Sequence, residues 1–211
     1  MVDLSLLSRA IDVGDREKTI QLTNEALSAG ASPQDIIVHG LQAGMAVVGE
    51  KFSSGAYFLP DMLMAARAMK AALEILKPSL KETGIPTIGK VVIGTVEGDI
   101  HDIGKNIVAT FLSGNGFEVF DLGVDVPDQK FIAEVREKKP DILGLSSLVT
   151  TTMPAMGSII KSLEEAGLRA NVKVIVGGAP VTQHFAENIG ADAYADDGGK
   201  AILVCKQLLG K

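Results

Sequence analysis

The chain has 211 residues, of which 46% are hydrophobic and 22% are charged, with a formal net charge of −6. This length suits one large domain or two small ones, and the ordinary apolar content excludes a mainly disordered chain. The acidic balance argues against binding to a nucleic-acid backbone, and no run of about 18 apolar residues predicts a membrane span. A single cysteine excludes an internal disulfide and a cysteine-based zinc or iron–sulfur site. Without a signal-peptide pattern, the sequence predicts a cytoplasmic globular protein.

The first part of the chain, up to about residue 82, has apolar residues at helical spacing. A first helix is expected to begin near Leu4, and Asp15 and Ser32 are placed to cap the second and third helices. Pro60 is placed to open a fourth helix. Because four helices joined by short loops pack most simply side by side, we predict a helical bundle domain over residues 1–83.

A polar segment at residues 81–87, broken by Gly and Pro, is interpreted as a linker, and after it the pattern changes. Short apolar runs then alternate with segments of helix length, which is typical of a parallel sheet covered on both faces. Residues 88–211 are therefore predicted to form a Rossmann-like, flavodoxin-like domain with strand order 2-1-3-4-5 and a last helix at about 199–209. The five expected strands are 91–96, 117–122, 142–145, 172–176 and, more weakly, 191–195. The fold class is α/β, with an N-terminal four-helix bundle followed along the chain by the five-stranded parallel sheet.

Three loops of this predicted sheet carry the residues of chemical interest. Ligands bind beyond the carboxyl ends of such strands, at the point where the strand order reverses. Asp99 and His101 follow the first strand, and an imidazole held by a carboxylate is a common arrangement for a metal ligand. A purely structural alternative is a polar loop in which Asp102 caps the next helix. Gly104 would leave room for a ligand lying against the start of that helix.

The loops after the third and fourth strands contribute hydroxyl groups and bare backbone. Together with the first loop they predict an elongated slot that runs down into the sheet. Each part also has a structural explanation, because Gly-Gly turns are frequent and Ser/Thr runs often cap helices. The residues concerned are Ser146, Thr150, Thr152, Gly177 and Gly178. Cys205, beside apolar residues in the last predicted helix, is interpreted as an unreactive buried thiol.

The spacing of these residues resembles a known cofactor-binding motif. The cobalamin-binding motif shared by methionine synthase and the base-off mutases is similar to Asp99-x-His101-x-x-Gly104, then 41 residues, Ser146-x-Leu148, then 28 residues and Gly177-Gly178. Residues 44–52 and 57–60 resemble the four-helix cap that accompanies the cobalamin domain in methyltransferases. Over almost its whole length, the chain resembles the small corrinoid proteins of anaerobic methyltransferase systems.

The resemblance implies a role for each residue of the motif. His101 would be the lower axial ligand of cobalt in methylcobalamin or a related corrinoid, with Asp99 and Thr152 as a relay behind it. The family often has Ser where Thr152 stands, and Thr keeps the hydroxyl. Phe52 and Leu59 would cover the upper corrin face; without the resemblance, both would be interpreted as bundle core. The residues implied to contact the cofactor are Gly98, Asp99, Ile100, His101, Asp102, Ile103, Gly104, Ser146, Leu148, Thr150, Gly177 and Gly178.

The resemblance also implies a function, that of a methyl carrier with no turnover of its own. A substrate-specific methyltransferase would load the cobalt from a methylamine, methanol, betaine or an aryl methyl ether. A second methyltransferase would pass the methyl group to a thiol or to tetrahydrofolate, and a reductive activase would be a further partner. One alternative is the cobalamin subunit of an adenosylcobalamin-dependent mutase, against which the helical cap argues. The other is a sensor, which would need a DNA-binding domain or, in a phospho-receiver, an Asp where the third strand ends at Ser146.

Overall fold

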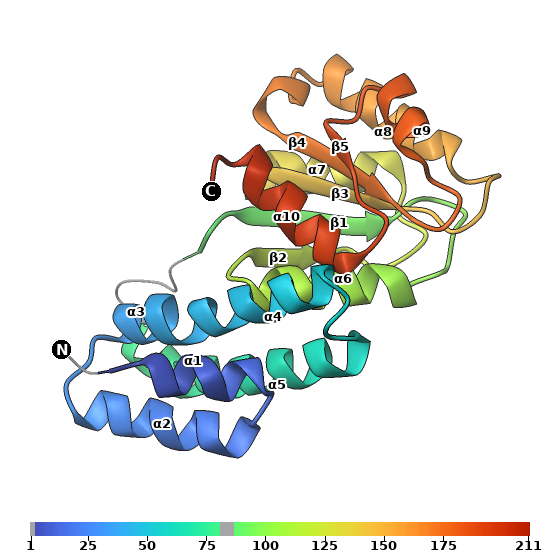
Figure 1. Cartoon of the computed structure of the whole chain (residues 1–211). Helices are drawn as coiled ribbons and strands as arrows, with labels where there is room; N and C mark the ends of the chain where they lie inside the picture. The colour runs from blue at the N-terminus through green and yellow to red at the C-terminus, as the bar shows by residue number, and fades with distance from the viewer. Residues whose placement is uncertain (1–2, 81–86) are drawn as a thin grey trace. The chain divides into compact units, whose positions relative to one another are not determined.

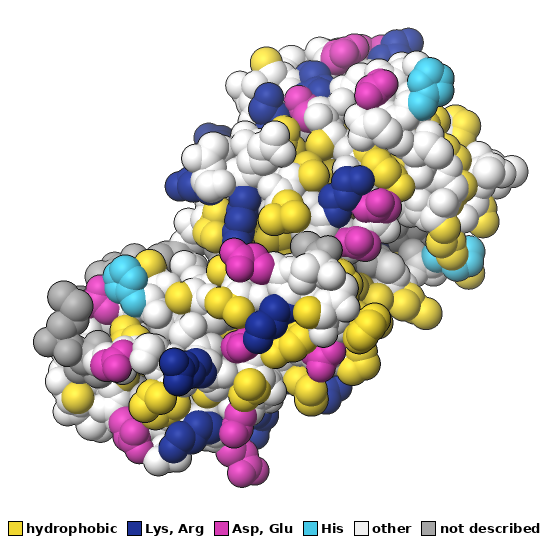
Figure 2. All heavy atoms as spheres, in the orientation of Figure 1, with side chains coloured by type: hydrophobic (Ala, Val, Ile, Leu, Met, Phe, Trp, Pro, Cys, Tyr) yellow, Lys and Arg dark blue, Asp and Glu magenta, His cyan; other side chains and the backbone are white. Residues whose placement is uncertain are grey.

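The computed structural model describes residues 3–80 and 87–211, and the chain divides into two compact units. The bundle consists of Met1–Thr87 with Gly114–Gly116, and the sheet domain consists of Ile88–Ser113 with Phe117–Lys211. Apart from Thr87, the predicted linker lies outside the described residues. Within the described ranges, no helix is both long and apolar enough to cross a membrane. On the face drawn in Figure 2, acidic and basic side chains are interspersed rather than gathered by sign.

The bundle contains four successive helical segments, as predicted. They are α1 (Ser5–Asp12), α2 (Arg16–Ser28), the continuous run of α3 (Pro33–Asp35), η1 (Ile36–Gln42) and α4 (Ala43–Ser53), and α5 (Leu59–Leu76), which the short η2 (Lys77–Leu80) follows. Both predicted caps are confirmed, since Asp15 accepts the Lys18 N–H at 2.9 Å and Ser32 accepts the Asp35 N–H at 3.0 Å. The π-helical turn pattern of η1 is a feature that the sequence analysis did not predict.

Two glycines bring the third helical segment close to α1. A Cβ atom on Gly40 would lie 2.6 Å from Leu7 Cδ2, and one on Gly44 would lie 2.6 Å from the Ser8 carbonyl oxygen and from Ile11 Cβ. These distances are shorter than van der Waals contact, so a larger residue at Gly44 would collide with the backbone of α1, and one at Gly40 would displace the Leu7 side chain. The four-residue spacing places both glycines on one side of the segment, against the buried side chains of α1.

The sheet domain confirms the predicted topology. Five parallel strands lie in the order β2-β1-β3-β4-β5. In chain order the elements are β1 (Lys90–Thr95), α6 (Ile103–Gly114), β2 (Glu118–Asp121), α7 (Asp128–Lys138), β3 (Ile142–Ser146), α8 (Pro154–Glu165), η3 (Arg169–Asn171), β4 (Lys173–Gly177), α9 (Gln183–Asn188), β5 (Ala193–Tyr194) and α10 (Gly198–Leu208). The weakly predicted fifth strand is present but short, and the last helix is where it was expected.

Helices cover both faces of the sheet. Val92, Leu143 and Val174 form one buried cluster with side chains of α7, α8 and α9. On the other side, α10 begins against α6, because a Cβ atom on Gly198 would collide with the ring of Phe111. In Figure 1, α10 crosses in front of the sheet and α7 lies behind it. Burial from both sides explains why the strands are nearly continuous apolar runs.

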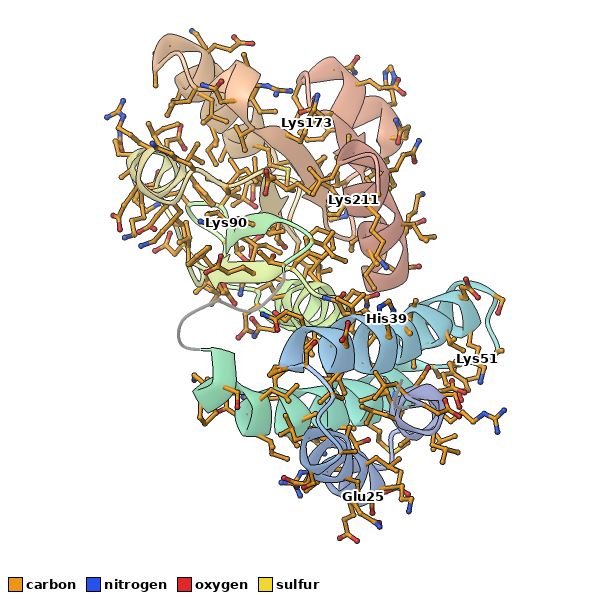
Figure 3. All side chains as sticks on the ribbon, turned by 90° about the vertical axis from the view of Figure 1, so that its left-hand side faces the viewer. Glu25, His39, Lys51, Lys90, Lys173 and Lys211 are labelled. Atoms are coloured by element: carbon orange, nitrogen blue, oxygen red, sulfur yellow. The ribbon has the colours of Figure 1, made fainter. Side chains whose placement is uncertain are left out.

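The register of the strands fixes where the loops begin. Thr95 pairs with Ser146, and Ser146 pairs with Gly177, so β1, β3 and β4 end at one level. The loops that follow these three strands therefore leave the sheet side by side. The opposite edge carries the strand starts; Figure 3 labels Lys90 and Lys173, the first residues of β1 and β4.

Candidate functional site

The loop after β1, residues 96–102, which we call the His loop, folds back onto the end of its strand. The Asp99 N–H donates to the Val96 carbonyl at 3.1 Å, and Gly98 between them has a φ of +81°. Glycine adopts this left-handed conformation without steric cost. The buried hydroxyl of Thr95 donates to the His101 carbonyl at 2.9 Å. The backbone of His101 is thus tied directly to the last residue of β1.

Asp99 and His101 form a close pair in which the carboxylate is buried and the imidazole is not. Asp99 Oδ1 lies 2.7 Å from His101 Nδ1 and accepts the His101 backbone N–H at 3.0 Å. The Asp99 side chain is 0% exposed, whereas that of His101 is 50% exposed. Because an ionised carboxylate can only accept, Nδ1 carries the proton and Nε2 of the neutral ring keeps its lone pair. The pair therefore presents a half-exposed imidazole with Nε2 able to bind a metal.

The second oxygen of Asp99 is held by the loop after β3. Oδ2 accepts the Leu148 N–H at 2.7 Å and the Thr152 hydroxyl at 3.1 Å, with the Ser147 hydroxyl 3.4 Å away. The hydroxyls of Ser147 and Thr152 are themselves 2.7 Å apart. The structure thus brings the predicted Thr152 to Asp99 and adds the buried Ser147, which the sequence analysis did not select. Its signal in the sequence is its place as the first residue after β3.

Several hydrogen bonds keep Asp99 ionised. Burial raises the pKa of Asp99, but the N–H groups of His101 and Leu148, the His101 ring and the Thr152 hydroxyl together hold that pKa well below its ordinary value. Asp99 is consequently an anion at neutral pH. A permanent negative charge beside Nδ1 favours the tautomer described above.

Two large aliphatic residues close to His101 in the sequence are open to solvent. Ile100 and Ile103 are 74% and 76% exposed, which is unusual for large aliphatic side chains. Gly104 is the second residue of α6, and a Cβ atom there would meet nothing within 4 Å. The packing of the chain itself does not require glycine at this position. Asp102 directly precedes α6; its carbonyl accepts the Asn106 backbone N–H and its carboxylate accepts from the Asn106 side chain.

The Gly177-Gly178 pair has a structural reason of its own. A Cβ atom on Gly177 would lie 2.7 Å from the Ala195 carbonyl oxygen. Gly178 has a φ of +131°, and a Cβ atom there would collide with the backbone of Ser147. Close approach of neighbouring loops is therefore sufficient to explain both glycines. Of the other predicted residues at this edge, Ser146 ends β3, and Leu148 and Thr150 are exposed in the loop that follows.

The two predicted cap residues belong to the bundle. Phe52 lies in the last turn of α4 and is partly buried, and Leu59 is the exposed first residue of α5. Phe58, the preceding residue, is also exposed and was not predicted. Leu59 is thus not part of the bundle core, which was the alternative interpretation of this residue.

Comparison with known proteins identifies the family. Two family models, each described as a B12 binding domain, match residues 89–203 and residues 4–77. Trimethylamine corrinoid protein 2 of Methanosarcina acetivorans is 50% identical over 190 residues, which cover 89% of this chain and 88% of that protein. The chain belongs to the family of B12-binding corrinoid proteins. Its cofactor is accordingly cobalamin or a related corrinoid, as the motif indicated.

Two further similar proteins support the assignment of the chain to this family. Dimethylamine corrinoid protein 1 of the same organism is 50% identical over 178 residues, which cover 84% of each chain. In the crystal structure of the methanol:cobalamin methyltransferase complex MtaBC from Methanosarcina barkeri, a chain matches with a TM-score of 0.89 and 34% identity. This match covers 98% of the present chain and 79% of the other. The predicted fold is therefore confirmed for both the sheet and the helical segment that precedes it in the sequence.

The residues of the sheet domain fit a corrinoid. Within residues 3–80 and 87–211, no group of three or more His, Cys, Asp or Glu side chains is arranged to hold a metal ion. A corrin brings its own equatorial nitrogen ligands, so a single imidazole such as that of His101 is a sufficient protein ligand. The exposed Ile100 and Ile103 offer apolar surface to a broad, flat group, and a Cβ atom on Gly104 beside them would meet nothing within 4 Å.

Proposed function

We propose that this corrinoid protein carries methyl groups for a methyltransferase that acts on methylamines. Relatives named for trimethylamine and dimethylamine are 50% identical to it, whereas the match in the methanol complex is 34% identical. When bound, the corrinoid supplies a cobalt centre that accepts a methyl group and gives it up again. Partners would be a substrate-specific methyltransferase, a second methyltransferase acting on a thiol or tetrahydrofolate, and a reductive activase. We place this activity in the cytoplasm.

The contact between Asp99 and His101 is the observation that carries the proposal. Nδ1 of the ring is occupied by the carboxylate at 2.7 Å, so Nε2 is the atom that would bind cobalt. Asp99 would orient the ring and hold the proton at Nδ1, and Thr152 would keep the carboxylate in place through Oδ2. In this role the chain supplies an oriented imidazole rather than a catalytic group of its own.

The remaining predicted residues would bind the rest of the cofactor. Residues 88–211 would form the cobalamin-binding domain, and residues 1–83 the cap that shields the upper corrin face through Phe52 and Leu59. Asp102 would contact the corrin while also closing the first turn of α6. The other residues proposed to contact the cofactor or its nucleotide tail are Gly98, Ile100, Ile103, Gly104, Ser146, Leu148, Thr150, Gly177 and Gly178.

The axial ligand can be tested with labelled histidine. The apo protein, prepared with either natural or ¹⁵N-labelled histidine, is loaded with cobalamin and reduced to the Co(II) state for electron paramagnetic resonance. We expect a nitrogen splitting that changes from three lines to two on labelling, and loss of this label-dependent change in His101→Ala. His39 and His184 provide matched controls, because both are exposed and neither belongs to the motif. A splitting that is insensitive to the label, or unchanged in His101→Ala, would contradict the proposal.

The partner can be tested by capture. Tagged protein loaded with cobalamin is incubated with lysates of methylotrophic cells grown on trimethylamine, dimethylamine or methanol, and the bound proteins are identified by mass spectrometry. We expect a methyltransferase that is induced by a methylamine. Capture of a methanol enzyme alone would refute the donor assignment. Activity supported by adenosylcobalamin and not by methylcobalamin would favour the mutase alternative.

A further inference from the structure

The loop between β2 and α7, residues 122–127, contacts the His loop from the side opposite β3. Asp125 in this loop has a φ of +53°, a left-handed conformation that is uncommon for residues other than glycine. Its backbone N–H donates to the Asp99 carbonyl at 2.9 Å, and its carboxylate Oδ1 accepts the Gly98 N–H at 2.7 Å. One residue therefore binds two consecutive residues of the His loop.

These two bonds continue the pairing of β1 and β2 past the end of the strands. The Thr95 N–H donates to the Gly123 carbonyl and the Val126 N–H donates to the Thr95 carbonyl, each at 3.0 Å, and Val96 and Val126 form an isolated parallel bridge. Beyond this bridge the His loop turns away from the strand direction at Gly98. Asp125 thus extends the β2 side of the sheet to the point at which the His loop departs from it.

Asp99 is consequently held from two sides. Its carboxylate is bound by Leu148 and Thr152, from the loop after β3, and its backbone carbonyl is bound by Asp125, from the loop after β2. A carboxylate can hold an imidazole in a fixed place only if its own backbone is fixed as well. The Asp99 side chain would otherwise rotate about its anchored oxygen and carry the His101 ring with it.

The identity of the residue at position 125 supports a functional role. Glycine would adopt the left-handed conformation without steric cost, whereas most other residues bear about 1 kcal/mol there, and Asp and Asn are tolerated because their short side chains bond locally. The chain instead has an aspartate whose side chain reaches back to the Gly98 N–H. Backbone strain that is retained together with a specific side-chain contact is typical of residues that organise a site.

We propose that Asp125 is a positioning residue for the axial ligand, which fixes the backbone of Gly98 and Asp99 and thereby the place of the His101 ring. This inference rests on the proposed function, because it assumes that His101 binds cobalt. It assigns to the loop after β2 a part in cofactor ligation that the sequence motif, confined to the loops after β1, β3 and β4, does not contain.

Two substitutions separate the carboxylate from the backbone strain. Asp125→Gly removes the side chain and relieves the φ of +53°, and Asp125→Asn keeps an oxygen acceptor and tolerates the left-handed conformation. Lys139 at the end of α7 is the other described non-glycine residue with a positive φ, +48°, so Lys139→Gly is a matched control for the relief of strain. We expect both glycine variants to unfold at or above the wild-type temperature.

The readouts are amide exchange in the apo protein and ligation in the loaded protein. In Asp125→Gly, we expect the Gly98 amide to exchange at least about tenfold faster, because its acceptor is gone. The ratio of His-on to His-off cobalamin at fixed pH, measured from the nitrogen splitting, is expected to fall by about tenfold. Asp125→Asn and Lys139→Gly should stay close to wild type in both measurements.

The possible outcomes distinguish this inference from the proposed function. A wild-type His-on ratio in Asp125→Gly would overturn the inference, and so would an equal loss in Asp125→Asn and Asp125→Gly, because the oxygen acceptor would then be irrelevant. Absence of a histidine splitting in the wild-type protein would instead refute the proposed function. The exchange rate of the Gly98 amide does not depend on the cofactor and tests the contact in either case.

Discussion

Substitution of Gly104 by alanine should have opposite effects on stability and on cofactor binding. The new Cβ atom would meet nothing within 4 Å, so the stability change is that of the backbone alone. Glycine in a helix costs about 0.5–1 kcal/mol relative to alanine. Since Gly104 lies only at the second position of α6, we expect the lower end of this range, an apo protein more stable by about 0.5 kcal/mol.

The same methyl group would occupy the space in which we propose that the corrinoid lies. Moving a closely packed ligand away from one methyl group is expected to weaken binding by about 1.4 kcal/mol or more, which is at least about tenfold in the dissociation constant. The gain in stability and the loss in affinity would therefore differ in sign. A substitution that merely disturbed the fold would lower both.

Two measurements test this expectation. Denaturant unfolding of the apo protein gives the stability change, and absorbance titration with cobalamin gives the affinity. Gly157 in α8 provides the control, because a Cβ atom there would make an ordinary contact of 3.4 Å with Ile189 Cγ2. Gly157→Ala should gain stability without losing affinity. Wild-type binding of cobalamin by Gly104→Ala, or an apo form less stable than the wild type, would contradict this expectation.

Three further substitutions and one labelling experiment test other parts of the structure. Asp99→Asn should cost about 2 kcal/mol at neutral pH, because the amide cannot accept from all the donors around it. The stability difference between wild type and Asp99→Asn should shrink as the pH falls below about 4, because Asp99 then takes up a proton in the unfolded chain while its lowered pKa keeps it ionised in the folded one. Denaturant unfolding at several pH values measures this difference, and a constant value would contradict the expectation. The buried ammonium of Lys105, 1% exposed, donates to both oxygens of Asp121, which is 36% exposed, at 2.6 Å. Asp121→Ala should therefore cost about 3 kcal/mol and Lys105→Met about 1 kcal/mol, because only the first leaves a buried charge; equal losses in denaturant unfolding would contradict this. Burial raises the pKa of the Cys205 thiol to about 12, so iodoacetamide at pH 8 should label the unfolded protein and not the native one. Rapid labelling of the native protein would contradict this expectation.

The sheet topology could be predicted from the sequence because each strand is recognisable in isolation. Buried parallel strands are nearly continuous apolar runs, and with intervening helices few connections are allowed. The buried face of α2 was harder to foresee. Thr19, Thr23 and Ala26 are its buried residues, while the larger Leu22 and Leu27 are only partly buried. The two threonine hydroxyls donate to backbone carbonyls four residues earlier, so they need no partner from another helix.

At the candidate site, the sequence indicated the residues of the motif and not the residues that support them. Asp99 and His101 are two residues apart, and Thr152 was selected as a hydroxyl of the loop after the third strand, with its place behind Asp99 implied by the family resemblance. The contact of Ser147 with Asp99 was not predicted, because neighbouring residues of a strand point to opposite sides. Only the observed end of β3 shows which of the two serines meets Asp99. The contact of Asp125 with the His loop was not predicted either. Asp125 is 27 residues from Gly98, and an aspartate in the sequence does not by itself indicate a left-handed backbone.

The strand order explains why this site lies on an inner strand rather than on an edge strand. Because β1 is paired with β2 on one side and β3 on the other, the loop that follows it can be bound from both sides. Asp125 and the Ser147–Thr152 segment make this double attachment, and His101 is left half exposed between them. An edge strand has a neighbour on one side only, so the same Asp-x-His sequence after β2 or β5 would lack one of the two anchors. A pre-organised imidazole is thus a consequence of where the strand order reverses as well as of the motif itself.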